Sequence, residues 1–210
     1  MIACIITYND IEVIKKSIES IYHKVNEIIV VDGKYSEFID DTIEWYSTDG
    51  TLEYLESLEK VKLLFGAGLL EHEKRNMYID LLHDGDMVLV LDSDEVVEGN
   101  IEDLPSEIDI GLVPFIDRKN IKYLATRLFR YRAGLRYMGV HYILQSEDGQ
   151  PFNTHTRAEP PYKDIKVNSF KIKHLWHLRD DRRQLYKSRY YKTLNVRETA
   201  YKRDSKFHIK

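Results

Sequence analysis

Short, continuous apolar runs that alternate with amphipathic segments constrain this sequence more than any other feature. Four such runs occupy positions 2–6, 27–31, 61–65 and 87–91, and the first is rich in β-branched residues. Strands that are covered on both faces, as in a parallel sheet, have this pattern. The isoleucines that recur at helical spacing after the first run are Ile11, Ile14, Ile18 and Ile21. We therefore predict repeated β–α–β units and an α/β fold.

Polar residues follow three of the predicted strands. Thr7, Asp32 and Asp92 each come directly after an apolar run. In open α/β sheets, ligands bind outside the carboxyl ends of the strands. We therefore expect these three residues to lie along one edge of the sheet and to mark a binding site.

The remaining pattern changes along the chain. Helices are predicted at 38–46, 52–58 and 71–83, and then strand-like pieces at 111–116, 125–131, 137–145 and 165–175. From residue 180 to about 206 a long basic helix is predicted, with tyrosines along one side. A length of 210 residues suits a single domain.

Composition and charge limit the classes of partner and the cellular location that we expect for this protein. A formal net charge of -4 gives no overall attraction to nucleic acid, so no such partner is expected. The only cysteine, Cys4, lies in an apolar run, where a small buried residue is expected. There is no signal-peptide pattern at the N-terminus, and no apolar stretch approaches the roughly 20 residues of a membrane span. We expect a cytoplasmic protein that contacts membranes, if at all, peripherally through its C-terminal helix.

The segment Asp92-Ser93-Asp94 is the main candidate for chemistry. Two carboxylates one residue apart at a strand end suit a hard divalent cation, Mn²⁺ or Mg²⁺, that also binds phosphate oxygens. Such a cation would neutralise charge on a leaving diphosphate. A solvated acidic turn explains the motif alone at least as well. A haloacid-dehalogenase-like phosphatase with Asp92 as nucleophile is a further alternative.

Several motifs in order resemble one enzyme family. They are CIITYN at 4–9, EIIVVDG at 27–33, KRN at 74–76 and VLVLDSDE at 88–95, followed more weakly by RLFR at 127–130, GVH at 139–141 and KH at 173–174. Together they are similar to the family-2 glycosyltransferases of GT-A fold, and among these to small lipopolysaccharide-type members. The resemblance implies a central, mostly parallel mixed sheet flanked by helices in one domain. That domain would cover 1–179, with a nucleotide-binding half (1–95), an acceptor and metal-completing half (96–179), and a basic helical tail at 180–210.

The resemblance also implies roles for individual residues. Thr7, Tyr8 and Asn9 would line the nucleotide site, and Asp32 would receive the base, where a carboxylate can accept from the ring N–H of uracil. UDP-sugar is therefore favoured as donor over GDP-sugar. Lys74 and Arg75 would reach the base edge or the diphosphate, although a solvated helix face paired with Glu71 and Glu73 is the simpler expectation from the residues alone.

The same resemblance assigns the metal site. Asp92 would contact the ribose and, through water, the metal, next to Ser93. Asp94 would be the direct metal ligand. His174 is the first choice for a further ligand, ahead of His177 and His141, because it ends a predicted strand in the matching place.

The acceptor side is less defined. An inverting transferase, which is favoured over a retaining one, needs a group that takes the acceptor proton. Related proteins often have His-Glu where this chain has His141-Tyr142, so the remaining candidates are His141 itself and the carboxylates Glu147, Asp148, Asp117 and Glu159. If nothing compensates for that carboxylate, the chain would be a non-catalytic relative that binds nucleotide or glycan.

The acceptor would be a glycan, a glycolipid or a protein. Four arginines could line its side, but a solvent-facing position is the preferred expectation for them. They are Arg127, Arg130, Arg132 and Arg136.

Overall fold

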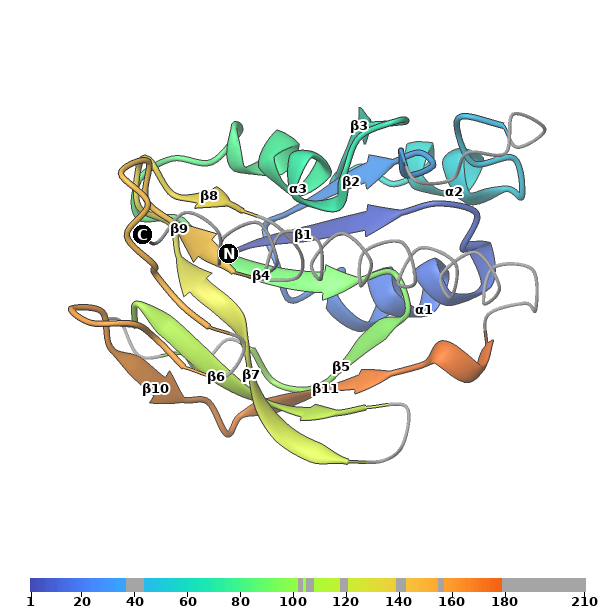
Figure 1. Ribbon diagram of the computed structural model, residues 1–210. Helices are drawn as coiled ribbons and strands as arrows, with labels where there is room; N and C mark the ends of the chain where they lie inside the picture. The colour runs from blue at the N-terminus through green and yellow to red at the C-terminus, as the bar shows by residue number, and fades with distance from the viewer. Residues whose placement is uncertain are drawn as a thin grey trace.

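The computed structural model of the chain describes residues 1–36, 44–101, 104, 108–117, 121–138, 143–154 and 157–178 (Figure 1). Its helices are α1 (Ile11–Ile21), α2 (Thr51–Glu56), α3 (Glu71–Ile79) and the 3₁₀ turn η1 (Trp176–Leu178). Its strands are β1 (Ile2–Thr7), β2 (Glu27–Asp32), β3 (Val61–Phe65), β4 (Met87–Asp92), β5 (Glu95–Gly99), β6 (Ile110–Ile116), β7 (Lys122–Arg130), β8 (Arg136–Tyr137), β9 (Leu144–Gln145), β10 (Asp164–Lys166) and β11 (Phe170–His174).

One mixed sheet runs through both halves of the chain. Its strand order is β3-β2-β1-β4-β7-β6-β11-β5, and β10 pairs with β6. The first four strands in this order are mutually parallel, as their continuous apolar runs predict. β7 then pairs antiparallel with β4 and β6, and β5 pairs antiparallel with β11. The protein is therefore α/β with a mixed sheet.

The sheet curls around helix α1. Ile14, Ile18 and Ile21 of α1 belong to one buried cluster with residues of β1, β2 and β4 and with Val97 of β5. Figure 1 shows α1 between the strands β1 and β4 and the strand β5. The backbone N–H of Val97 also donates to Ser20 Oγ in α1 at 3.0 Å. Helix α1 thus fills the inside of the curl.

A second apolar cluster covers the opposite face of the sheet. Tyr78 and Ile79 of α3 pack with alternate residues of β1, β2 and β4 and with Tyr137 of β8. The Tyr78 and Tyr137 rings meet edge to face, with centroids 5.9 Å apart. Because both faces of the parallel strands are covered, their side chains are apolar in both directions, as the sequence indicates.

The elements of the first half agree with the sequence predictions, with four differences. Helix α2 spans Thr51–Glu56 rather than 52–58. Helix α3 ends at Ile79 rather than at 83, because the N–H groups of Leu81 and Leu82 donate to carbonyls three residues earlier and the chain tightens into a turn. Residues 44–46 are not helical, and 38–43 lie outside the described residues. The strand β5 was not predicted.

In the second half two predicted strands are confirmed with altered limits, 111–116 as β6 and 125–131 as β7. The single strands predicted at 137–145 and 165–175 are wrong, because neither segment is continuous in strand. The segment 137–145 contains the ends of two short strands, β8 and β9, and the segment 165–175 divides into β10 and β11. The predicted basic helix from residue 180 lies outside the described part of the chain. Within that part, no helix is long and apolar enough to cross a membrane.

Candidate functional site

The carboxyl ends of β1, β2 and β4 meet at one edge of the sheet. Thr7 pairs in register with Asp32, and Ile6 pairs with Asp92. The prediction that Thr7, Asp32 and Asp92 share an edge is confirmed. This edge is the candidate site.

Asp32 is fully buried and bound by a serine that the sequence did not indicate. Ser47 donates its backbone N–H to Asp32 Oδ2 at 2.9 Å and its hydroxyl to Oδ1 at 2.5 Å. Burial raises the pKa of Asp32, and the two Ser47 hydrogen bonds lower it in part. A nucleobase that binds Asp32 must therefore share these oxygens with Ser47. The base-binding role of Asp32 stays a prediction.

The loop after β1 is tied to the same serine. Asn9 has a positive φ of 48° and donates its N–H to Ser47 Oγ at 2.7 Å. Its side-chain oxygen accepts from the Thr48 N–H at 2.8 Å. Tyr8 is fully buried and donates its hydroxyl to the Glu44 carbonyl at 2.7 Å. Tyr8 and Asn9 thus fix the conformation of the loop after β1. The sequence around Ser47 contains no motif from which the hydrogen bonds of Ser47 could be predicted.

Lys74 and Arg75 are buried, so the expectation of a solvated helix face is wrong for both. Arg75 donates to Glu71 Oε1 and to Asp92 Oδ1, each at 3.1 Å. The pairing with Glu71 that the spacing suggested is therefore present, but inside the protein. Lys74 Nζ donates to the Gly33 carbonyl and lies 4.3 Å from the centre of the Tyr35 ring.

Asp94 and His174 are brought together from distant parts of the chain. Asp94 Oδ2 lies 3.4 Å from His174 Nε2, and the Asp94 side chain is fully buried. The Leu175 N–H donates to the Asp94 carbonyl at 2.6 Å, which fixes the end of β11 beside the turn after β4. Ser93 Oγ donates to Asp10 Oδ2 at 2.5 Å, so the turn is also held to the start of α1.

The donors of this edge suit a divalent cation only in part. Asp94 supplies carboxylate oxygens and His174 an imidazole nitrogen, while Asp92 beside them is already engaged by Arg75. Among the described residues, no group of three or more His, Cys, Asp or Glu side chains could hold a metal ion. A cation here would need further oxygens from a ligand such as a diphosphate. A nitrogen donor in the set favours Mn²⁺ over Mg²⁺, which prefers oxygen ligands throughout.

A buried ion pair lies directly behind the Asp92–Asp94 turn. Arg127 Nη2 donates to Glu95 Oε1 at 2.5 Å, and Glu95 Oε2 accepts from the Asp92 N–H at 2.9 Å. Burial raises the pKa of Glu95, and the neighbouring Arg127 guanidinium acts in the opposite direction and favours the ionised carboxylate. The expected solvent-facing position is therefore wrong for Arg127, which is 5% exposed.

The other three arginines lie at the opposite edge of the sheet. In the register of β4 and β7, Arg130 lies opposite Met87 at the start of β4, and its guanidinium donates to the Gly85 carbonyl. Arg132 pairs with Asp109, and Arg136 pairs with Asp80. None of the three contacts the Asp92–Asp94 turn through these bonds.

The structure separates the candidate bases. Glu147 and Asp148 lie in the turn after β9, where Glu147 faces Gly134. The loop around Gly134 is bonded to Asp84 and Gly85, which precede β4, whereas Asp92 ends that strand. Figure 1 accordingly shows β8 and β9 on the side from which β4 starts. These two carboxylates do not lie with Asp92 and Asp94.

Asp117 is placed differently. It follows Ile116, which pairs with Lys173 next to His174. The phenol of Tyr123 is within electrostatic reach of both Asp117 and Asp92, whose charges add to the effect of burial in raising its pKa. Glu159 pairs with Arg157, and His141 lies outside the described residues.

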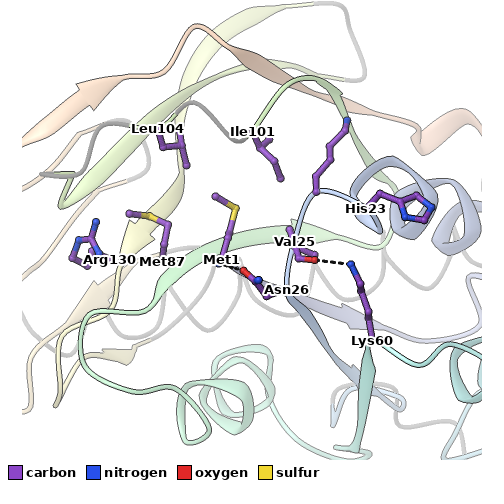
Figure 2. Close-up of a pocket in the computed structure, with 10 residues that line it drawn as sticks. Met1, His23, Val25, Asn26, Lys60, Met87, Ile101, Leu104 and Arg130 are labelled. Atoms are coloured by element: carbon purple, nitrogen blue, oxygen red, sulfur yellow. Dashed lines mark hydrogen bonds between the residues drawn. The ribbon is translucent and has the colours of Figure 1, made fainter.

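A separate hollow of about 650 Å³ lies at the opposite edge of the sheet (Figure 2). Met1 and Met87, at the starts of β1 and β4, line it together with Ile101 and Leu104. Lys60 donates to the Tyr22 and Val25 carbonyls, and Figure 2 shows the second of these bonds. Of the residues considered from the sequence, the hollow contains only Arg130, one of the four acceptor-side arginines, and none of the nucleotide, metal or base candidates that the structure describes.

Comparisons with known proteins find only distant likenesses. No protein-family model matches the sequence, and a search of curated proteins finds no significant match. A crystal structure of S. aureus TarS is similar with a TM-score of 0.43 and 21% identity over 57% of this chain. The crystal structure of S. aureus TarS 1-349 in complex with UDP gives a TM-score of 0.42 and 22% identity over 57% of this chain. A crystal structure of S. aureus TarS 1-349 gives 0.38 and 19% over 61%.

The matches span 22%, 37% and 46% of these TarS chains. Because each TM-score is below 0.5, the likeness is too weak to carry an argument about function.

Proposed function

We propose that this chain is a glycosyltransferase that takes a sugar from a nucleotide-diphosphate donor, with UDP-sugar favoured over GDP-sugar. One observation carries the proposal: Asp94 and His174, distant in sequence, face each other at 3.4 Å on the edge where Asp32 and Asp92 converge. These are the residues that the resemblance to family-2 glycosyltransferases assigns to the donor site.

The donor would lie along the carboxyl ends of β1, β2 and β4. Asp32 would accept from the base, with Ser47 holding the carboxylate in place. Arg75 would act mainly by fixing Asp92, since its guanidinium already bridges Glu71 and Asp92. Asp92 keeps 23% of its side chain exposed, which leaves it accessible to a ribose hydroxyl.

Asp94 and His174 would hold a divalent cation, Mn²⁺ or Mg²⁺, together with the donor's diphosphate oxygens. The cation would supply Lewis-acid stabilisation of the charge on the departing nucleoside diphosphate. The protein would then supply two ligands, Asp94 and His174, and the diphosphate of the donor would supply the others.

Glycosyl transfer forms a bond between the acceptor oxygen and the anomeric carbon, and the bond to the diphosphate breaks. In an inverting reaction a base must take the acceptor proton. Asp117 is the carboxylate that best suits this role, because it directly follows β6, whose last residue Ile116 pairs with Lys173 next to His174. Asp117→Asn should lower kcat by about 10²–10⁴-fold, the usual contribution of a general base. Glu147→Gln, at the opposite edge, should leave kcat unchanged.

A thermal-shift panel tests the proposed function. UDP, GDP and their sugar conjugates would each be added with and without Mn²⁺, since a ligand that binds the folded state raises its apparent stability. We expect a shift with UDP or UDP-sugar that depends on Mn²⁺ and is lost in Asp94→Ala. Absence of any nucleotide shift would contradict the proposal. Hydrolysis of a phosphate ester that Asp92→Asn abolishes would indicate a phosphatase instead.

A further inference from the structure

Three carboxylates occupy four consecutive positions at the end of β4, and two of them, Asp94 and Glu95, are fully buried. Asp92, Asp94 and Glu95 surround the turn, and Glu95 is fully buried. A carboxylate buried beside two others is costly unless a cation compensates its charge. Arg127, on β7, is the cation that pairs with it.

The Glu95 carboxylate links the turn to this distant strand. One oxygen accepts from the Asp92 N–H at 2.9 Å, and the other accepts from Arg127 at 2.5 Å. The conformation of the turn between Asp92 and Glu95 therefore depends on where Arg127 holds the carboxylate.

Arg127 also lies near His174, with the Phe115 ring between them. Its guanidinium carbon lies 5.2 Å from the centre of the Phe115 ring, and the Phe115 ring lies 6.4 Å from that of His174. In the register of β5 and β11, Glu95 is paired with His174 itself. The Arg127 side chain is thus linked to both members of the Asp94–His174 pair, to Asp94 through the adjacent Glu95 and to His174 through Phe115.

We propose that Arg127 is a positioning residue that, through Glu95, holds the Asp92–Asp94 turn and His174 at the separation a divalent cation requires. The inference rests on the proposed function, because the cation belongs to the donor site. Arg127 does not contact the donor or the cation in this scheme. Groups behind metal ligands typically change metal affinity by about 10–100-fold when they are replaced.

The test uses the full chain and measures Mn²⁺ binding directly. Free Mn²⁺ would be followed by electron paramagnetic resonance, with Mn²⁺ alone and with Mn²⁺ plus UDP. Arg127→Met could prevent folding, because it leaves the Glu95 charge buried and unpaired. The double variant Glu95→Met with Arg127→Met removes both charges and keeps similar volume, a change that proteins often tolerate.

We expect the double variant to unfold cooperatively near the wild-type temperature while its Kd for Mn²⁺ in the presence of UDP rises about tenfold or more. Arg127→Lys, which keeps the charge but not the planar donor pair, should give an intermediate Kd. Lys171→Met is the matched control, since it removes the exposed ion pair between Lys171 of β11 and Glu98 of β5, the strand that also carries Glu95. Its Kd should equal that of the wild type.

A folded double variant with the wild-type Kd for Mn²⁺ would overturn the positioning role, because a merely structural pair changes the unfolding temperature alone. The proposed function would survive that result. If the wild-type protein bound no Mn²⁺ with or without UDP, the metal assignment and this inference would both fall.

Discussion

The Asp32 carboxylate lies in the protein interior and is held by both donors of Ser47. Burial raises its pKa, and the Ser47 hydrogen bonds act in the opposite direction. The residue that the sequence singles out thus depends on a serine in a segment without any motif. A carboxylate held in this way is fixed in orientation, as recognition of a base would require.

Ser47→Ala should lower the free energy of unfolding by about 1–3 kcal/mol, the usual cost of leaving a buried group without its partner. The loss should be larger at about pH 8 than at about pH 4, because the lost bond favours the ionised carboxylate. Burial raises the folded pKa of Asp32, so its contribution to stability is full below the unfolded pKa and falls as pH rises through the folded pKa. The Ser47 hydroxyl lowers that folded pKa, so its removal makes the fall in stability at high pH larger.

Urea denaturation at the two pH values checks this. In an Asp32→Asn background, Ser47→Ala should show a loss that no longer varies with pH. An equal loss at both pH values in the native background would show that Asp32 does not carry the effect.

At the scale of elements, the end of β2 depends on a glycine. Gly33 has a φ of 132°, and a Cβ there would lie 2.6 Å from the backbone nitrogen of Ala67. Its carbonyl also accepts from Lys74. The loops after β2 and β3 can approach this closely only because Gly33 has no side chain.

Gly33→Ala should therefore lower the free energy of unfolding by about 1–3 kcal/mol or more, from backbone strain and the contact with Ala67. Gly85→Ala is the control, because Gly85 also has a positive φ, of 91°, but nothing lies within 4 Å of its Cβ position. Thermal unfolding of both variants separates the two causes. Equal losses would mean that the close approach to Ala67 is unimportant.

The sequence predicts the elements of the first half well for a physical reason. β1, β2 and β4 are covered on both faces, so their apolar runs are continuous and easily recognised. β5 escapes prediction because it is short, begins with Glu95 directly after the Asp-Ser-Asp motif, and ends with Glu98 and Gly99 exposed. Its place depends on antiparallel pairing with β11, far along the chain.

At the scale of the whole molecule, the curl of the sheet around α1 joins the two halves. Ile18 is 1% exposed and belongs to the cluster that includes strands from both halves. The sequence predicts the apolar face of α1 and a strand in the region of β11, but not β5 or the way that β5 and β11 close over the helix, since both are placed by long-range pairing.

Ile18→Ala should cost about 2–5 kcal/mol of unfolding free energy, as for other large-to-small changes in a packed core. Ile121→Ala should change it by less than about 0.5 kcal/mol, because surface substitutions rarely do more. Ile121 is 54% exposed. Denaturant titration measures both variants. A small loss for Ile18→Ala would mean that α1 is not the centre of the fold.

The candidate site, like the fold, has one part that could be predicted from the sequence and one part that could not. Asp32, Asp92 and Asp94 follow recognisable strands and could be named from the sequence. The burial of Arg75 and the Arg127–Glu95 pair could not, because each depends on side chains that meet only after the strands are ordered. Asp117 rather than Glu147 emerges as base candidate for the same reason.

The most direct test of the central claim is a crystal of the full chain soaked with Mn²⁺ and UDP, measured at the manganese absorption edge. The anomalous signal locates the ion independently of any assumed role. We predict one peak between the Asp94 carboxylate and His174 Nε2, in contact with the diphosphate of UDP. A peak at another place, or UDP bound away from Asp32 and Asp94, would contradict the proposed donor site.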